Sequence, residues 1–211
     1  MIRVLLVDDH AVVRVGFRLL LQTASDVVVV AEAESGESAC QQFAEVAPDV
    51  AIMDISMPGM GGFEAVRRIR LRQPTAKILA LSAHDDATHA RRALRQGAMG
   101  FLSKRSAPEV LLEAVRAVAC GKRYLDARLA QELALTGLDG ESESTIDRLS
   151  EREFEVFMRL AKGATVEKIA KELSVSASTI GTHLYNVKQK LGAVNQSEIT
   201  LIALRAGLIE A

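Results

Sequence analysis

Hydrophobic and polar positions follow two different rhythms along the chain. From residue 1 to about 121, short aliphatic runs alternate with segments whose apolar residues recur at helical spacing. The runs predict strands at Ile2–Val7, Val27–Ala31, Val50–Met53, Ile78–Leu81 and Gly100–Leu102. The segments between them predict helices at Val12–Leu21, Ser38–Val46, Phe63–Arg72, Thr88–Gln96 and Glu109–Ala119.

This alternation indicates the fold class of the first half. The strand runs are almost continuously apolar, which is typical of strands buried on both faces. Successive strand–helix units therefore predict an α/β domain, a doubly wound five-stranded parallel sheet with helices on both faces. In such sheets functional groups gather at the carboxyl ends of the strands, near the switch point between the first and third strands.

The second half has a purely helical pattern. Residues 136–147, TGLDGESESTID, are polar, acidic and glycine-containing, and they indicate a linker. Helices are then predicted at Phe154–Ala161, Val166–Leu173, Ala177–Leu191 and Gln196–Ala206, with Ser150 and Glu153 as a capping box before the first. The expected organisation is a first domain over 1–121, a linker with a helix over 122–147, and a smaller all-α helix-turn-helix domain over 148–211.

Carboxylates are expected to meet at one edge of the sheet. Asp8 and Asp9 follow the first strand and Asp54 ends the third, and these strands are neighbours in the predicted order. Left alone, the acids would repel one another and some would take up protons. A hard cation relieves that repulsion, so the sequence predicts Mg²⁺ (or Mn²⁺) here.

Two further strand ends extend this site. Ser82 ends the fourth strand, and Lys104 follows the fifth strand shortly after Phe101. A hydroxyl and an ammonium beside a cation suit a tetrahedral oxyanion, so a phosphoryl group is expected there, with Asp54 as its covalent acceptor. Singly, these residues have simpler explanations: a helix cap for Asp9, a turn for Ser82, a solvated surface for Lys104 and the core for Phe101. Their conjunction favours the phosphoryl site.

The helices at Val166–Leu173 and Ala177–Leu191, joined by three residues, have a helix-turn-helix layout. Small polar side chains remain on the outer face of the second helix, where they can bond base edges, and its lysines can reach phosphates. The candidate DNA-contacting residues are Ser176, Ser178, Thr179, Gly181, Thr182, Tyr185, Asn186, Lys188, Gln189 and Lys190. The near balance of charge in this half leaves an RNA-binding or protein-interaction module open as alternatives.

The last predicted helix carries an apolar stripe of Ile199, Ile202, Ala203 and Ala206. We expect the stripe to be exposed beyond the small core and to pair two domains across a two-fold axis. The alternative is that it closes the core of its own domain.

Composition adds few constraints. The chain has 211 residues and a formal net charge of −1, so it carries no overall basic signal for nucleic acid. Cys40 and Cys120 have no metal-ligand spacing and are expected to be reduced. The N-terminus does not have a signal-peptide pattern, and no apolar run is long enough to span a membrane. We therefore expect a cytoplasmic protein with no membrane partner.

The ordered motifs VLLVDDH, MDISMPGMGG, ALSA and GAMGFLSK resemble the receiver domain of bacterial two-component response regulators. The resemblance implies that a sensor histidine kinase phosphorylates Asp54. It also implies Asp9 and Asp54 as direct metal ligands, Asp8 through water, and the backbone carbonyl of Ser56. Ser82 and Lys104 would bind phosphoryl oxygens, and Phe101 would turn inward on activation. Receivers usually carry an acidic or amide residue where this chain has Gly61.

The second half, LSEREFEV…AKG…KIAKELSVSASTIGTHLYNVKQKLG, resembles the LuxR/FixJ/NarL-type DNA-binding domain. The whole chain resembles a NarL-type response regulator, and GKRYLDARLAQELAL resembles its GacA/UvrY-like branch. This implies a transcriptional regulator, not an enzyme, that binds double-stranded promoter DNA and forms a homodimer when phosphorylated. Ser178 and Gly181 stand where many relatives carry Lys, so we expect weaker or more salt-sensitive binding, or compensation by dimerisation.

Two other functions fit an acidic sheet edge less well. A haloacid-dehalogenase-like phosphatase needs a second carboxylate two residues after its nucleophile, where this chain has Ser56. A flavodoxin-like FMN site needs a hydroxyl- and amide-rich loop, and Asp8 with Asp9 would repel the FMN phosphate. Whether His84 tunes dephosphorylation is left open.

Overall fold

The computed structural model describes residues 1–83, 87–136, 145–206 and 208–209. The chain divides into two compact units, Met1–Glu141 and Ser142–Ala211. Each is described by itself. His84 and residues 137–144 of the expected acidic linker lie outside the described residues.

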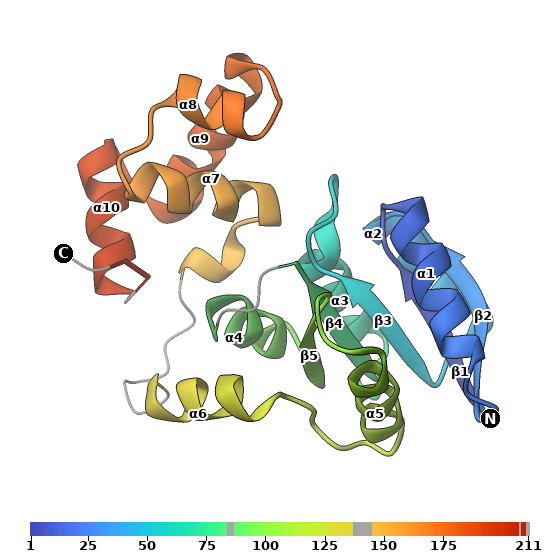
Figure 1. Ribbon diagram of the computed structural model, residues 1–211. Helices are drawn as coiled ribbons and strands as arrows, with labels where there is room; N and C mark the ends of the chain where they lie inside the picture. Colours follow the sequence, from blue (N-terminus) through green and yellow to red (C-terminus); the bar gives the residue numbers. More distant parts are fainter. Residues whose placement is uncertain (84–86, 137–144, 207, 210–211) are drawn as a thin grey trace. The chain divides into compact units, whose positions relative to one another are not determined.

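A parallel sheet organises the first unit. In the described part of the chain its strands are β1 (Ile2–Val7), β2 (Val27–Ala33), β3 (Val50–Asp54), β4 (Ile78–Ser82) and β5 (Gly100–Ser103). Their order is β2-β1-β3-β4-β5, which confirms the doubly wound prediction (Figure 1). Because β1 lies between β2 and β3 with Val7 opposite Met53, the residues that follow β1 and those that end β3 meet at one edge.

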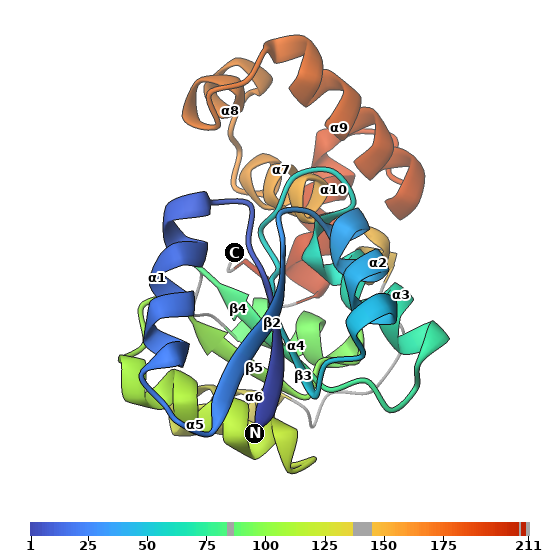
Figure 2. The same cartoon turned by 90° about the vertical axis from the view of Figure 1, so that its right-hand side faces the viewer.

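Helices cover both faces of this sheet because alternate strand residues point to opposite sides. Leu6 and Ile52 pack beneath α1 (Ala11–Gln22) and α5 (Pro108–Ala119), whereas Leu5 and Met53 pack on the other side. That side is covered by α2 (Gly36–Val46), α3 (Gly61–Arg72) and α4 (Ala87–Arg95) (Figure 2). Each fully buried large aliphatic side chain contributes about 1.5–3 kcal/mol to folding.

The segment after α5 is part of the first unit. Tyr124 pairs with β5: its carbonyl accepts the N–H of Phe101 at 3.0 Å and its own N–H donates to the carbonyl of Met99 at 3.1 Å. This pairing covers an otherwise open sheet edge. The following helix, α6 (Ala127–Thr136), packs on α4, and Leu129 is fully buried in the same core as Phe101. The connecting segment therefore touches the receiver-like core directly.

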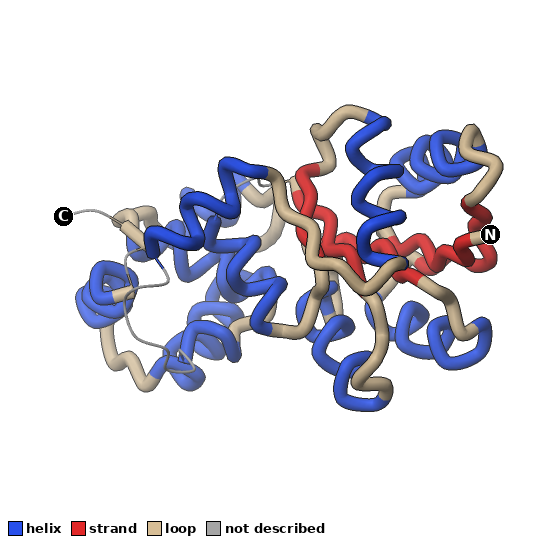
Figure 3. Tube along the Cα trace, turned by 90° about the horizontal axis from the view of Figure 1, so that it is seen from below, coloured by secondary structure: helices blue, strands red, loops and turns tan. Residues whose placement is uncertain are grey.

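The described residues of the second unit form helices and no strand (Figure 3). They are η1 (Thr145–Arg148), a 3₁₀ turn, and the α-helices α7 (Glu151–Ala161), α8 (Val166–Glu172), α9 (Ala177–Leu191) and α10 (Gln196–Arg205). The capping box of Ser150 and Glu153 is present at the start of α7, and Gly192 ends α9 with a φ of +69°. Among the described helices, none has both the length and the apolar composition needed to cross a bilayer.

Gly62 is where α3 approaches the end of β3. A Cβ at this position would lie 2.0 Å from the carbonyl oxygen of Asp54 and 2.5 Å from Cα of Ile55. We predict that Gly62→Ala lowers the free energy of unfolding by about 2 kcal/mol or more, because backbone must move. Gly16→Ala is the control: space around Gly16 is open and it lies inside α1, so a gain of about 0.5–1 kcal/mol is expected. Urea unfolding of both full-length variants measures the difference, and equal midpoints would contradict it.

Candidate functional site

Three strand ends of the first unit bring opposite charges together. Asp8 follows β1 and Asp54 ends β3, and both side chains are buried, at 1% and 0% exposure. Lys104 follows β5, and its Nζ donates to Oδ2 of Asp8 at 2.6 Å and to Oδ2 of Asp54 at 2.7 Å. The structure thus places two buried carboxylates around one ammonium, as the strand order required.

Backbone donors fix the other carboxylate oxygens. The N–H of His10 donates to Oδ1 of Asp8 at 2.8 Å, and the N–H of Ser56 donates to Oδ1 of Asp54 at 2.9 Å. Arg14, from the first turns of α1, bonds the backbone carbonyl of Asp8 at 2.7 Å. Both carboxylates are therefore held in one orientation before any ligand arrives.

Burial raises the pKa of Asp54, while the ammonium of Lys104 and the N–H of Ser56 oppose that shift. Burial alone would lower the pKa of Lys104, but its bonds to Asp54 and Asp8 raise it. Lys104 therefore stays positively charged, and the nearby carboxylate of Asp8 adds to the cost of ionising Asp54. The site has more acids than cationic groups to neutralise them.

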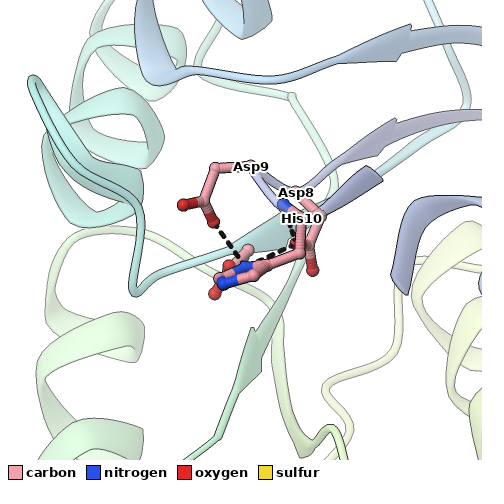
Figure 4. Close-up of side chains that lie close together, drawn as sticks. Asp8, Asp9 and His10 are labelled. Atoms are coloured by element: carbon pink, nitrogen blue, oxygen red, sulfur yellow. Dashed lines mark hydrogen bonds and ion pairs between the residues drawn. The ribbon is translucent and has the colours of Figure 1, made fainter. Parts of the chain in front are cut away.

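The donor set at this edge fits a divalent cation. Oδ1 of Asp9 is buried without a hydrogen-bond donor in the described part of the chain. Nδ1 of His10 lies 2.9 Å from this oxygen (Figure 4). Among the described residues, ligand atoms of Asp8, Asp9, His10 and Asp54 all lie within 4.8 Å of one another. Carboxylate oxygens so placed are what Mg²⁺ prefers.

His10 is the member of this cluster that the sequence analysis did not select. Its position directly after Asp8 and Asp9 was the sequence feature that could have indicated its place beside these acids. In the structure its backbone bonds Asp8 and its ring turns back to the acids.

The remaining predicted groups lie along the same strand ends. Ser82 ends β4, beside β3, and is fully buried. Its carbonyl accepts the N–H of Lys104 at 2.7 Å. Oγ of Ser56 is buried without a partner among the described residues. Phe101 is 0% exposed, so its ring already points inward in this structure.

The backbone conformation at the start of α3 explains why a glycine is tolerated at position 61. Its φ is +71°, in the left-handed region that glycine enters freely. Asn and Asp are the other residues that tolerate this region. Gly61 therefore keeps the backbone shape that an acidic or amide residue would also allow.

In the second unit most of the predicted DNA-contacting residues are exposed. Asn186 and Lys188 are partly buried, and the others at the start and along the outer face of α9 are exposed: Ser176, Ser178, Thr179, Gly181, Thr182, Tyr185, Gln189 and Lys190. The lysines have partners inside the unit. Nζ of Lys190 donates to the buried Glu153 at 2.6 Å, and Nζ of Lys188 donates to the carbonyl of Val194 at 2.9 Å. A DNA phosphate would have to compete with these contacts.

The expected exposure of the α10 stripe is wrong. Ile199 and Ala203 are fully buried, and Ile202 and Ala206 are partly buried against the same core. The reason is that α10 packs on α7, which turns this face toward the core of its own unit. The exposed large apolar side chains here are instead Val194, at 76%, and Leu201, at 44%.

Comparison with known protein families identifies both units. Residues 4–116 match the response regulator receiver domain, and residues 147–203 match the bacterial regulatory proteins of the luxR family. The chain therefore belongs to the response regulators that join a receiver to a LuxR-type DNA-binding domain, and it is a transcriptional regulator of a two-component system.

Individual relatives extend over the whole length. The chain is 39% identical to the response regulator UvrY of Escherichia coli K12, across 100% of this chain and 97% of that protein. It is 36% identical to the response regulator GacA of Pseudomonas protegens, across 100% and 99%. A solved structure of RcsB from Salmonella enterica serovar Typhimurium, bound to promoter rprA with the phosphomimetic BeF₃⁻, is 27% identical. It aligns with a TM-score of 0.59, across 95% of this chain and 97% of that one.

The raised pKa of Asp54 predicts how the free energy of unfolding depends on pH. A carboxylate with a folded-state pKa above its ordinary value of 3.8 penalises folding once it ionises, and the penalty disappears as pH falls below that value. Asp54→Asn is therefore expected to raise the free energy of unfolding at pH 7. The gain should shrink as the pH is lowered through the folded-state pKa. Urea titrations in EDTA from pH 7 to pH 4 measure it, and a less stable variant at pH 7 would be the opposite result.

Proposed function

We propose that Asp54 accepts a phosphoryl group from a sensor histidine kinase, and that the phosphorylated chain binds double-stranded promoter DNA through α9 as a homodimer. The observation that carries this proposal is the bridge from Lys104 to both Asp8 and Asp54. Asp54 is the acceptor because it lies on the rigid end of a central strand, with one oxygen held by Ser56 and the other facing the ammonium.

The transfer chemistry follows from these contacts. An oxygen of Asp54 attacks the phosphorus in line, the P–O bond forms as the P–N bond of the kinase phosphohistidine breaks, and the imidazole keeps the electron pair. Lys104 and the hydroxyl of Ser82 would each pair with a phosphoryl oxygen. Mg²⁺ (or Mn²⁺), when bound, would neutralise charge on the transferred group, held by Asp9, Asp54 and the carbonyl of Ser56, with Asp8 through water.

This chain offers the kinase an exposed apolar surface beside the site. Val12, Val15 and Leu19 are 86%, 43% and 58% exposed, and their spacing places them on one face of α1. This helix starts at the acidic cluster, because its N-cap residue is His10 and Arg14 bonds the backbone carbonyl of Asp8. We infer that a helix of the kinase packs on this stripe while its phosphohistidine approaches Asp54.

Support for the DNA step comes from the outer face of α9. Tyr185 is 64% exposed, and the small polar residues before it leave room for a duplex. The RcsB relative, which was solved on promoter DNA, supports duplex DNA as the ligand. For the homodimer, we infer contacts through two exposed apolar side chains, Val194, two residues before α10, and Leu201, within it.

The functional test measures DNA binding and mass together. Acetyl phosphate with Mg²⁺ should strengthen binding to a duplex selected from a random-sequence library and should shift the mass in solution toward a dimer. Asp54→Asn is expected to lose both responses. Asp49→Asn, one residue before the opposite end of β3, is the matched control and should keep both. Equal DNA affinity and mass with and without acetyl phosphate would contradict the proposed switch.

Gly181 offers a second prediction about the DNA interface. It lies on the exposed face of α9, and a Cβ there would meet nothing within 4 Å. Gly181→Lys should therefore tighten duplex binding and steepen the plot of log affinity against log salt by about 0.9, the effect of one added phosphate contact. Gly181→Ala raises helix propensity without charge, so its salt slope should stay unchanged. Equal slopes for the two variants would place Gly181 away from the DNA.

A further inference from the structure

An exposed stripe on the outer face of α9 carries no charged side chain. It consists of Ser178, Gly181, Thr182 and Tyr185, which recur at helical spacing and are all exposed. The two lysines of α9 lie in its last turn, where both are bonded to groups of the same unit. The bidentate contact with guanine that arginine or lysine makes is therefore not available on this stripe.

The serine and threonine hydroxyl groups of the stripe are bonded within the helix. Oγ1 of Thr182 donates to the backbone carbonyl of Ser178 at 3.2 Å, and Oγ of Ser178 lies 2.8 Å from Oγ of Ser176. Because the hydroxyl of Thr182 turns back to the preceding turn of the helix, this side chain offers its methyl group outward. Gly181 has no side chain to cover that methyl group, and the exposed ring of Tyr185 extends the apolar surface by one turn.

An apolar group at this place selects one feature of the major groove. Thymine is the DNA base whose edge carries a methyl group there, whereas guanine, cytosine and adenine present hydrogen-bonding groups. When two methyl groups meet, apolar surface is removed from water on both sides. A stripe with a methyl group, an aromatic ring and no cation therefore favours thymine.

We propose that α9 reads thymine through its C5-methyl group, and that the methyl group of Thr182 makes the contact. The operator of this chain then carries a T·A pair opposite Thr182 in each half-site. The inference rests on the proposed function, because it needs α9 in the major groove of double-stranded DNA. It goes further by naming the base that the duplex presents and the residue that selects it.

Removing the methyl group from the DNA is the first test. Phosphorylated full-length protein selects a duplex from a random-sequence library, and each thymine is then replaced in turn by deoxyuridine, which lacks only the methyl group. With wild type, this replacement at one thymine in each half-site should lower the affinity about fourfold, the effect of burying one such group. Equal affinity for every substituted duplex overturns the proposal.

Three variants assign the deoxyuridine penalty to Thr182. Thr182→Ser keeps the hydroxyl and loses the methyl group, so the penalty should disappear, whereas Thr182→Val keeps a methyl group and should keep the penalty. Thr200→Ser in α10 is the matched control and should also keep it, because Oγ1 of Thr200 likewise bonds a carbonyl four residues earlier, that of Gln196, at 3.2 Å. A penalty that survives in Thr182→Ser, or that is lost in Thr182→Val, overturns the proposal.

Cytosine provides an independent measurement of the same methyl group. The critical T·A pair is replaced by C·G, with and without a methyl group at C5 of the cytosine. Wild type should bind the methylated duplex about fourfold more tightly than the unmethylated one, and Thr182→Ser should bind the two equally. Equal binding of the two duplexes by wild type overturns the inference.

The library selection separates this inference from the function on which it rests. If phosphorylated wild type binds a selected duplex and tolerates deoxyuridine at every position, only the thymine inference is wrong. If it binds no duplex, the proposed function is wrong and this inference falls with it.

Discussion

The ammonium of Lys104 between two buried carboxylates is the contact on which the first unit's chemistry depends. Asp8 and Asp54 would repel each other and would be costly to bury without it. The contact exists only because β1, β3 and the end of β5 deliver their last residues to one edge of a parallel sheet. Under the proposed function, an arriving phosphoryl group would offer Lys104 a more strongly charged partner than either carboxylate, so the resting contact and the new one would compete for the same ammonium.

A change at Lys104 could reach residues beyond the site, because β5 is bonded to β4 on one side and to Tyr124 on the other. Lys104 bonds the backbone of Ser82, and Phe101 bonds the backbone of Tyr124, where the chain turns toward α6. Leu129 of α6 then shares a core with Phe101. A movement of Lys104 or Phe101 would therefore displace neighbouring residues in the segment that leads to the second unit. That segment need not itself contact the acidic cluster.

Much of this arrangement could be predicted from the sequence, because it depends on local pattern. An apolar run that ends in an acid located Asp54, and parallel-sheet topology was enough to bring Asp8 and Lys104 beside it. Distant packing was not predictable in the same way. The stripe of Ile199 and Ala203 has helical periodicity whether it faces α7 or a second molecule, so periodicity alone could not show which surface covers it. The bond from Lys190 to Glu153 joins residues 37 positions apart, and charge counts gave no sign that this lysine was already paired.

Locating the phosphoryl group chemically tests the role of Asp54 most directly. The chain is treated with acetyl phosphate and Mg²⁺, the acyl phosphate is reduced with borohydride, and peptide mass spectrometry finds the aspartate that has become homoserine. We expect homoserine at position 54 and at neither Asp8 nor Asp9. Homoserine at one of those two positions, or an unmodified Asp54 in protein that has taken up phosphate, would contradict it.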